Sequence, residues 1–153
     1  MIIRTAKKSD LNGLMKLLEE MVIYHTKIDK YYKSFSKFSE LKDEAESWLS
    51  NKDMKVLVAE DESGLISYAQ VSVEDAPTYA TVSRIGVVYD MYVREPYRRS
   101  GIANQMFAEV MDWFGKKKIK NIELSVDARN AAGVKYWESL GFFVYKFRMR
   151  KDL

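Results

Sequence analysis

The residues with the clearest chemical potential lie together in residues 91–103, which read MYVREPYRRSGIA. This pattern predicts a strand, then a tight basic turn, then the first turn of a helix. Such a geometry leaves several backbone N–H groups unpaired at the start of the helix, next to Arg98 and Arg99. Because the amino-terminal end of a helix is also the positive end of its dipole, the turn suits the pyrophosphate of a phosphorylated cofactor.

Three small or rigid residues favour this interpretation of the turn. Pro96 lacks an N–H group and helps to end the strand, whereas Gly101 lets a phosphate approach the backbone closely. Ala103 is small for the same reason and also packs against the sheet. The alternative is an ordinary strand–helix connection with a basic surface patch. The glycine pattern is not that of a dinucleotide-binding fold or a P-loop, because neither Gly-x-Gly-x-x-Gly nor Gly-Lys-Ser/Thr is present.

The chain has no cysteine and a single histidine. The lack of cysteine excludes disulfides, thiolate zinc sites and a cysteine acyl-enzyme. One histidine, His25, excludes a multi-histidine metal site and disfavours Ser-His-Asp catalysis, and we expect it to have a surface or capping role. The sequence therefore predicts no metal site.

The 153 residues are enough for one domain with a substantial core, so we expect residues 1–153 to form a single domain. The net charge of +3 is compatible with an anionic ligand but does not indicate nucleic-acid binding. No apolar run approaches the roughly 20 residues that span a bilayer. The amino-terminal residues also show no signal-peptide pattern. These features predict a cytoplasmic protein that binds neither nucleic acid nor a membrane.

Apolar periodicity predicts the elements that must position the basic turn. Strands are expected over residues 2–4, 55–60, 65–73, 83–93, 122–126 and 142–149. Helices are expected after an N-cap at Ser9 and over residues 40–49, 99–117 and 130–140. Residues 24–38 show no clear period and carry several tyrosines and phenylalanines. This order is typical of a mixed α/β sheet with helices on both faces.

A second motif lies one helix and one strand beyond the turn, where residues 130–142 read NAAGVKYWESLGF. With both motifs in order and correctly spaced, the chain resembles the GNAT superfamily of acetyl-CoA-dependent N-acetyltransferases. Members carry a Gln/Arg-x-x-Gly-x-Gly/Ala turn after the fourth strand. An asparagine, a short helix with an aromatic pair, and Leu-Gly-Phe then follow. The resemblance implies the GNAT fold, a central twisted mixed sheet splayed at strands 4 and 5 with helices on both faces.

The resemblance also implies that acetyl-CoA binds along the fourth strand and the turn. The end of that strand would pair with the pantetheine arm as an added strand does. Main-chain N–H groups of residues 98–103 would hold the pyrophosphate, with Asn104 capping the set, and Asn130 would lie near the pantetheine. Gly133 and Tyr136 lie one helical turn apart, so both are expected to face the cofactor. The expected cofactor-binding residues are Met91, Tyr92, Val93, Arg98, Arg99, Ser100, Gly101, Ile102, Ala103, Asn104, Asn130, Gly133 and Tyr136.

For the chemistry, the resemblance implies acetyl transfer to a primary amine by direct attack in a ternary complex, which is consistent with the lack of cysteine. Many members place a tyrosine acid where this chain has Trp137, and an indole N–H is not a useful acid. Three sources of the proton remain open: Tyr136 reaching the sulfur from a shifted helix, another tyrosine such as Tyr89 or Tyr31, or water with no protein acid. We favour the last, and we expect Trp137 to be a core aromatic.

The candidate base is Asp90, a carboxylate inside an otherwise apolar strand, where an unpaired charge is unfavourable and so indicates a function or a partner. It would receive the proton of the amine or bind a cationic substrate. The alternative is an ion pair with one of three arginines, Arg84, Arg148 or Arg150. Asp90 and Tyr136 are therefore the candidate catalytic residues.

The amine acceptor is not identified by the sequence. The aromatic residues of segment 24–38 suit an amine cation or a peptide amino terminus, but they equally suit ordinary packing of a loop. Small amines, polyamines, amino acids, aminoglycosides and protein amino groups all stay open. A non-catalytic CoA-binding module is the alternative function, and a homodimer is compatible with the family, in which dimers are common.

Overall fold

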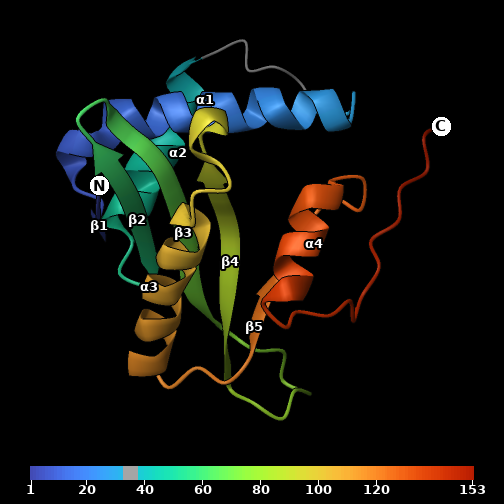
Figure 1. Ribbon diagram of the computed structural model, residues 1–153. Helices are drawn as coiled ribbons and strands as arrows, with labels where there is room; N and C mark the ends of the chain where they lie inside the picture. Colours follow the sequence, from blue (N-terminus) through green and yellow to red (C-terminus); the bar gives the residue numbers. More distant parts are fainter. Residues whose placement is uncertain (33–37) are drawn as a thin grey trace.

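The computed structural model describes residues 1–32 and 38–153 as a layered α/β structure (Figure 1). The strands are β1 (Ile2–Thr5), β2 (Met54–Asp61), β3 (Gly64–Asp75), β4 (Arg84–Val93) and β5 (Ile122–Leu124). The helices are α1 (Leu11–Ile28), α2 (Phe38–Ser50), α3 (Ile102–Lys116) and α4 (Ala131–Ser139). The strands form one mixed sheet in the order β1-β2-β3-β4-β5. The predicted mixed α/β class is confirmed.

The direction of each strand follows from the connection that precedes it. The strands β1 to β4 pair with antiparallel neighbours, and a tight turn joins β2 to β3. β5 is parallel to β4 because the chain crosses over through α3 before it returns to the sheet. The sheet thus ends at a short parallel edge strand.

The helices cover both faces of the sheet, as the sequence predicted (Figure 1). The helices α1 and α2 bury Leu14, Leu17 and Leu41 against one face. On the other face, α3 buries Met106 and Phe114. The residues that pack against this second core also include partly buried side chains of α4 and the segment after it, Trp137, Leu140 and Phe142. Among the described residues, no helix is long and apolar enough to cross a membrane.

Two helices begin later than the sequence predicted. Ser9 is not the N-cap of α1, because it lies inside a short 3-10 helix, Lys8–Asp10, and α1 starts at Leu11. α3 starts at Ile102 because Gly101 before it has a left-handed backbone with φ of +86°. α1 also continues to Ile28, so part of segment 24–38 is helical. The predicted aromatic wall includes residues 33–37, which lie outside the described residues.

The predicted closing strand over residues 142–149 is wrong. Residues 142–153 follow α4 as an extended trace without regular secondary structure (Figure 1). Alternation of apolar and polar residues indicates a segment with one apolar and one polar face. A strand also needs a neighbouring strand for its backbone hydrogen bonds. In the described part of the chain, β5 pairs only with β4.

Candidate functional site

The candidate site is the cleft where β4 and β5 separate. The two strands pair only from Gly86 to Val88 on β4 and over the three residues of β5. Beyond that point Met91, Tyr92 and Val93 still pair with β3. No described strand lies on their other edge, so the main chain of β4 there is available to a ligand.

A cavity of about 260 Å³ occupies this separation. Its walls come from the carboxyl-terminal half of α1, the end of β4, the basic turn, and the segment from β5 into α4. The lining residues are Met21, Tyr24, His25, Val88, Tyr89, Asp90, Met91, Tyr92, Val93, Arg98, Leu124, Ser125, Val126, Asp127, Asn130, Ala132, Gly133 and Trp137. Six of the thirteen predicted cofactor-binding residues line this cavity: Met91, Tyr92, Val93, Arg98, Asn130 and Gly133. Residues 99–104 lie in the basic turn and at the start of α3, outside the lining, and so does Tyr136 on α4.

A β-bulge decides which way Asp90 points. The register shifts so that Gln70 lies opposite Asp90 while Val71 lies opposite Val88, which leaves Tyr89 as the extra residue. Val88 packs on the face that α3 covers. Without the bulge Asp90 would share that face, because alternate residues of a strand do. With it, Asp90 lies beside the buried hydroxyl of Tyr68, on the face that α1 and α2 cover.

The Asp90 carboxyl group has an altered acidity in this position. Burial raises the pKa of Asp90 to about 6, the hydroxyl of Tyr68 opposes this rise, and the charge of Glu44 adds to it. The predicted alternative, an ion pair with an arginine, is not seen. No ion pair among the described residues includes Asp90, and Arg84 and Arg150 bond to other groups.

The basic turn is held by its own backbone. Arg99 and Gly101 both have left-handed backbones, with φ of +61° and +86°, and the Ser100 hydroxyl donates to the carbonyl of Tyr97 at 2.5 Å. No described side chain caps α3. The N–H groups of its first turn, which includes Ile102 and the residues after it, have no acceptor within the helix.

Three side chains of the turn differ in what they contribute. Arg98 is exposed, but its Nε donates to the carbonyl of Val93 at 3.0 Å and its guanidinium lies 4.8 Å from the ring centre of Tyr24. Asn104 is exposed and its side chain makes no capping bond to α3, so its predicted place beside the pyrophosphate stays a prediction. Ala103 is partly buried at the start of the helix. Arg98 therefore links the turn to the cleft wall.

Asn130 organises the opposite wall. Its side-chain oxygen accepts hydrogen bonds from the N–H of Gly133 and from the hydroxyl of Tyr24, both at 3.1 Å. The first bond caps α4 and the second joins α4 to α1. Gly133 has to be small, because a Cβ there would lie 2.7 Å from Nδ2 of Asn130.

The aromatic pair of α4 divides between the core and the cleft. Trp137 packs edge-on against Phe107 and Phe142 at ring distances of 5.7 and 5.4 Å and also lines the cavity. The predicted packing role of Trp137 is therefore confirmed. Tyr136 is not in the cavity wall; its hydroxyl is buried without a hydrogen-bond partner among the described residues, and burial raises its pKa to about 12.

The other tyrosines proposed as acids have different surroundings. Tyr89 lines the cavity, but its hydroxyl donates to the carboxylate of Glu74, which raises its pKa. Tyr31 is exposed and lies beneath the guanidinium of Arg150, 4.4 Å from it, outside the cavity wall.

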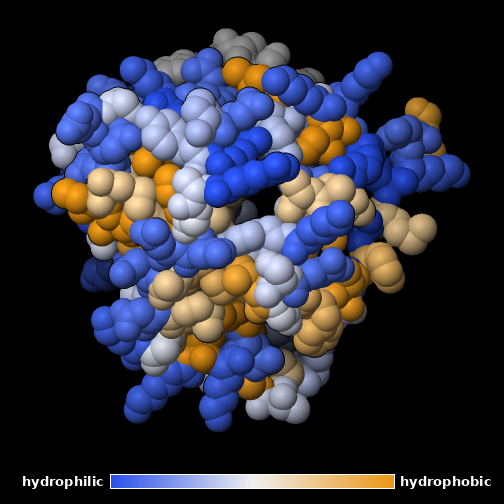
Figure 2. Space-filling view, viewed as in Figure 1, coloured by the Kyte–Doolittle hydropathy of each residue, from blue (hydrophilic) through white to orange (hydrophobic). Residues whose placement is uncertain are grey.

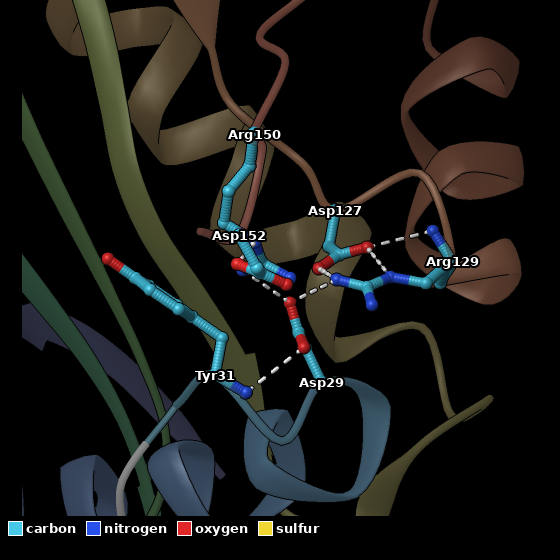
Figure 3. Close-up of polar contacts among 6 residues, drawn as sticks. All are labelled: Asp29, Tyr31, Asp127, Arg129, Arg150 and Asp152. Atoms are coloured by element: carbon cyan, nitrogen blue, oxygen red, sulfur yellow. Dashed lines mark hydrogen bonds and ion pairs between the residues drawn. The ribbon is translucent and has the colours of Figure 1, made fainter.

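A buried carboxylate holds one end of the cleft together (Figure 3). Asp29, at the end of α1, accepts from Arg129 and, at 3.0 Å, pairs with Arg150. Its other oxygen accepts from the N–H of Tyr31 at 3.0 Å. Arg129 also pairs with Asp127 at 2.9 Å. The cluster ties α1 to the loop that carries Asn130 and to the segment after α4.

We expect Asp29→Asn to lower the melting temperature by several degrees at pH 7. The two arginines hold the pKa of Asp29 well below its usual range, so the carboxylate stabilises the fold above its unfolded pKa of about 4. This contribution is lost as the pH falls through the lowered folded value. Thermal unfolding from pH 3 to 7 checks this: the gap between variant and wild type should narrow toward low pH.

Asp152→Asn is the matched control, because the side chain of Asp152 is 88% exposed and pairs with Nε of Arg150 at 3.6 Å. It should leave the melting temperature unchanged. If Asp29→Asn and Asp152→Asn changed the melting temperature equally, a special role for the buried carboxylate of Asp29 would be contradicted.

The sequence missed three residues that shape the site. Tyr24 bridges to Asn130, and Tyr68 lies beside Asp90. The side chain of His25 was expected on the surface or at a cap, but it lines the cavity, and its buried Nδ1 has no partner among the described residues. For Tyr24 and His25 a signal existed, since they follow Met21 at helical spacings of three and four. Nothing in the sequence marked Tyr68.

Comparison with known proteins agrees with this geometry. The model of the acetyltransferase (GNAT) family matches residues 19–142. No curated protein sequence matches the chain. The structure of the BH1408 protein from Bacillus halodurans (a tetramutant) is similar, with 24% identity, a TM-score of 0.83 and full coverage of both chains.

Two further solved structures are similar. One is a predicted acetyltransferase with acetyl-CoA from Clostridium acetobutylicum, at 21% identity, with a TM-score of 0.79 and coverage of 99% of this chain and 95% of that one. The other is the aminoglycoside 6′-N-acetyltransferase AAC(6′)-IG from Acinetobacter haemolyticus, at 19% identity, with a TM-score of 0.76 and coverage of 99% and 100%. At such identities these likenesses show the fold alone.

Proposed function

This chain belongs to the acetyltransferase (GNAT) family, and we propose that it moves an acetyl group from acetyl-CoA to a primary amine by direct attack in a ternary complex. One observation carries the proposal. The open main-chain edge of β4 and the partly buried carboxyl group of Asp90 line the same cleft, so a donor and a base can meet there.

The cofactor would lie across the cleft from the basic turn to α4. The main chain of Met91, Tyr92 and Val93 offers hydrogen-bonding groups to the amides of pantetheine. The sequence predicted that the N–H groups of residues 98–103 bind the pyrophosphate, but the N–H of Arg98 donates to the carbonyl of Glu95 at 3.2 Å. The N–H groups of residues 99–104 suit the pyrophosphate instead, because they gather at a helix start that no described side chain caps. Asn130 and Gly133 would flank the pantetheine from the other wall.

Acetyl-CoA supplies an activated acetyl group whose leaving group is a thiolate. For the chain's own part, Asp90 would take a proton from the incoming ammonium and so release the lone pair of the amine. Main-chain N–H groups at the separated end of β4 would stabilise the negative charge that develops on the carbonyl oxygen. The low dielectric of the cleft strengthens both effects.

The departing thiolate would take its proton from water, not from a side chain of the protein. Tyr136 is a poor acid, with a pKa of about 12 and a place outside the cleft wall, and the hydroxyl of Tyr89 is engaged by Glu74. The indole of Trp137 cannot serve. The sequence-based preference for release without a protein acid therefore stays our proposal.

For the acceptor we propose a cationic amine. Its ammonium group would meet the carboxylate of Asp90 and the aromatic rings of Tyr24 and Tyr89 in the cleft. The AAC(6′)-IG structure belongs to an enzyme named for an aminoglycoside, which supports aminoglycosides among the acceptors that the sequence left open, beside small amines, polyamines, amino acids and protein amino groups. A cytoplasmic location stays a prediction.

The test is a thiol-release assay with acetyl-CoA against a panel of these amines, run beside calorimetric titration with CoA. We expect turnover with at least one amine and binding of CoA in the micromolar range or tighter. Tight CoA binding without turnover for any amine would favour the non-catalytic CoA-binding module, and absence of both would contradict the whole assignment.

A further inference from the structure

A second cavity, below called the edge groove, lies at the β1 edge of the sheet, whereas the cleft lies at the β5 edge. Its volume is about 310 Å³, at the lower end of the range for pockets that bind small molecules. None of its lining residues also lines the cleft, so the two cavities are separate. The edge groove is lined by Thr5, Ala6, Trp48, Leu49, Lys52, Met54, Lys55, Val56 and Trp113.

The edge groove exists because β1 is shorter than its neighbour β2. β1 ends at Thr5, and the last described hydrogen bond between the two segments runs from the N–H of Ala6 to the carbonyl of Val56 at 2.8 Å. Met54 and Lys55 begin β2 beyond this point and pair with β3 on their other side. The space beside them, which a longer β1 would have filled, is therefore open to a ligand.

Two tryptophans from opposite layers of the fold form the apolar walls of the edge groove. Trp48, near the end of α2, is buried in the core that α1 and α2 cover. Trp113, in the last turns of α3, is partly buried against the core on the other face of the sheet. An indole ring presents a large flat apolar surface and pairs favourably with other aromatic rings. The walls therefore suit a planar aromatic group.

The charge of the edge groove is positive. Lys52 and Lys55 line it, and its lining contains no carboxylate. No ion pair of the described residues includes either lysine, so both ammonium groups are available to an anion. A third lysine, Lys117, lies over the ring of Trp113, with Nζ 5.9 Å from the ring centre. Figure 2 shows hydrophilic side chains around this carboxyl-terminal end of α3, at the lower left of the view.

We propose that the edge groove binds a small planar aromatic anion, such as an aromatic carboxylate. The ring of the ligand would lie against the two tryptophans, and its carboxylate would lie beside Lys52 and Lys55. Ion pairs with exposed lysines contribute little alone, so the affinity depends on the ring and the charge being present in one molecule. The proposal does not depend on the proposed acetyl transfer, because the two cavities share no residue.

The first test is calorimetric titration of the intact chain with 2-naphthoate. A ligand of about a dozen non-hydrogen atoms should bind with a dissociation constant of about 100 µM or below. The amide 2-naphthamide keeps the ring without the charge, and acetate keeps the charge without the ring. Each should bind about tenfold more weakly or worse. Excess CoA should leave the affinity for 2-naphthoate unchanged.

Three results of this titration would overturn the proposal. The first is absence of binding by 2-naphthoate. The second is equal binding of 2-naphthamide, which would show that the lysines do not contribute. The third is competition by CoA, which would place the aromatic anion in the cleft rather than in the edge groove.

Two double variants with the same net charge locate the bound anion. Lys52→Met with Lys55→Met removes both charges of the edge groove and should weaken binding of 2-naphthoate by about tenfold or more. Lys146→Met with Lys151→Met removes two charges at exposed positions outside the groove and should leave the affinity within about twofold of wild type. Equal affinities of the two double variants would mean that the ligand responds only to net charge, against the proposal.

Trp113→Leu tests the aromatic wall separately from the charge. Leucine keeps an apolar side chain against the core but removes the flat ring, so binding of 2-naphthoate should fall by about tenfold or more. Circular dichroism checks that the variant is folded. Wild-type affinity in the folded variant would overturn the proposal, and if this variant does not fold, the lysine variants decide.

Discussion

Gly101→Val should weaken CoA binding by about 100-fold or more, the loss expected when two charge-assisted hydrogen bonds are removed. Gly101 has φ of +86° and stands directly before the first turn of α3. A Cβ at this position meets no described atom closer than Nε2 of Gln105, at 4.0 Å. The side chain would therefore occupy the space that a phosphate needs, rather than space used by the fold. Calorimetric titration with CoA measures the effect.

The backbone strain of this substitution has its own control. A branched residue in a left-handed conformation costs about 1–3 kcal/mol, which a fold stabilised by about 5–15 kcal/mol can tolerate. Gly64→Val imposes the same kind of strain at the first residue of β3, directly after the turn from β2, where φ is +106° and nothing lies within 4 Å of an added Cβ. It should lower the melting temperature comparably and leave CoA affinity unchanged. If Gly101→Val and Gly64→Val bound CoA with similar affinity, the assignment of the phosphate turn would be contradicted.

Asp90→Asn should lower kcat by about 100-fold to 10,000-fold, the range typical for loss of a general base. The amide keeps the size of the carboxylate but cannot accept the amine proton, so CoA affinity should stay at the wild-type value. Steady-state kinetics with the best acceptor from the panel, together with CoA titration, separates the two effects. Wild-type turnover in this variant would remove Asp90 from the mechanism.

The pH dependence gives an independent readout of the same group. With a pKa of about 6, Asp90 is protonated at low pH, so kcat/KM should rise with pH and level off above about 7. The hydroxyl of Tyr68 opposes the rise in the pKa of Asp90, so Tyr68→Phe should move the rising part of the kcat/KM profile to higher pH. If that part of the profile did not move, a group other than Asp90 would control it.

Stability should respond in the opposite direction to activity. The folded pKa of Asp90 is raised above its unfolded value of about 3.9, so between these values the folded state binds more protons and stability falls as the pH rises. About two pKa units correspond to about 3 kcal/mol, which sets the upper limit of the effect. Asp90→Asn should therefore be more stable than wild type at pH 7 and equal to it near pH 3. Chemical denaturation at both pH values checks this.

Much of the fold could be predicted from local pattern. The mixed α/β class, the helices on both faces and the order of the elements up to α4 follow from apolar periodicity and from residues such as Gly101 and Gly141 that end or limit helices. The two motifs that carry the family resemblance are also local. Their chemistry depends on backbone groups at a helix start and a strand end, which short segments specify by themselves.

The strand after α4 could not be predicted in the same way. Residues 142–149 have the alternation of a strand, yet they form none in the described fold. Alternation depends on the segment alone, whereas a ladder depends on a second segment being present at the right distance. The sequence of one segment contains no information about that neighbour.

The sequence by itself determined the turn at Gly101, the helix start at Asn130 and the replacement at Trp137, because each is a matter of residue type at a fixed spacing. Only the tertiary structure decided that Asp90 faces Tyr68, that Tyr24 bonds to Asn130, and that Tyr136 lies outside the cleft. The reason is physical. A single bulged residue, Tyr89, reverses the face of every residue after it, and it is defined by the register between two strands rather than by either strand alone.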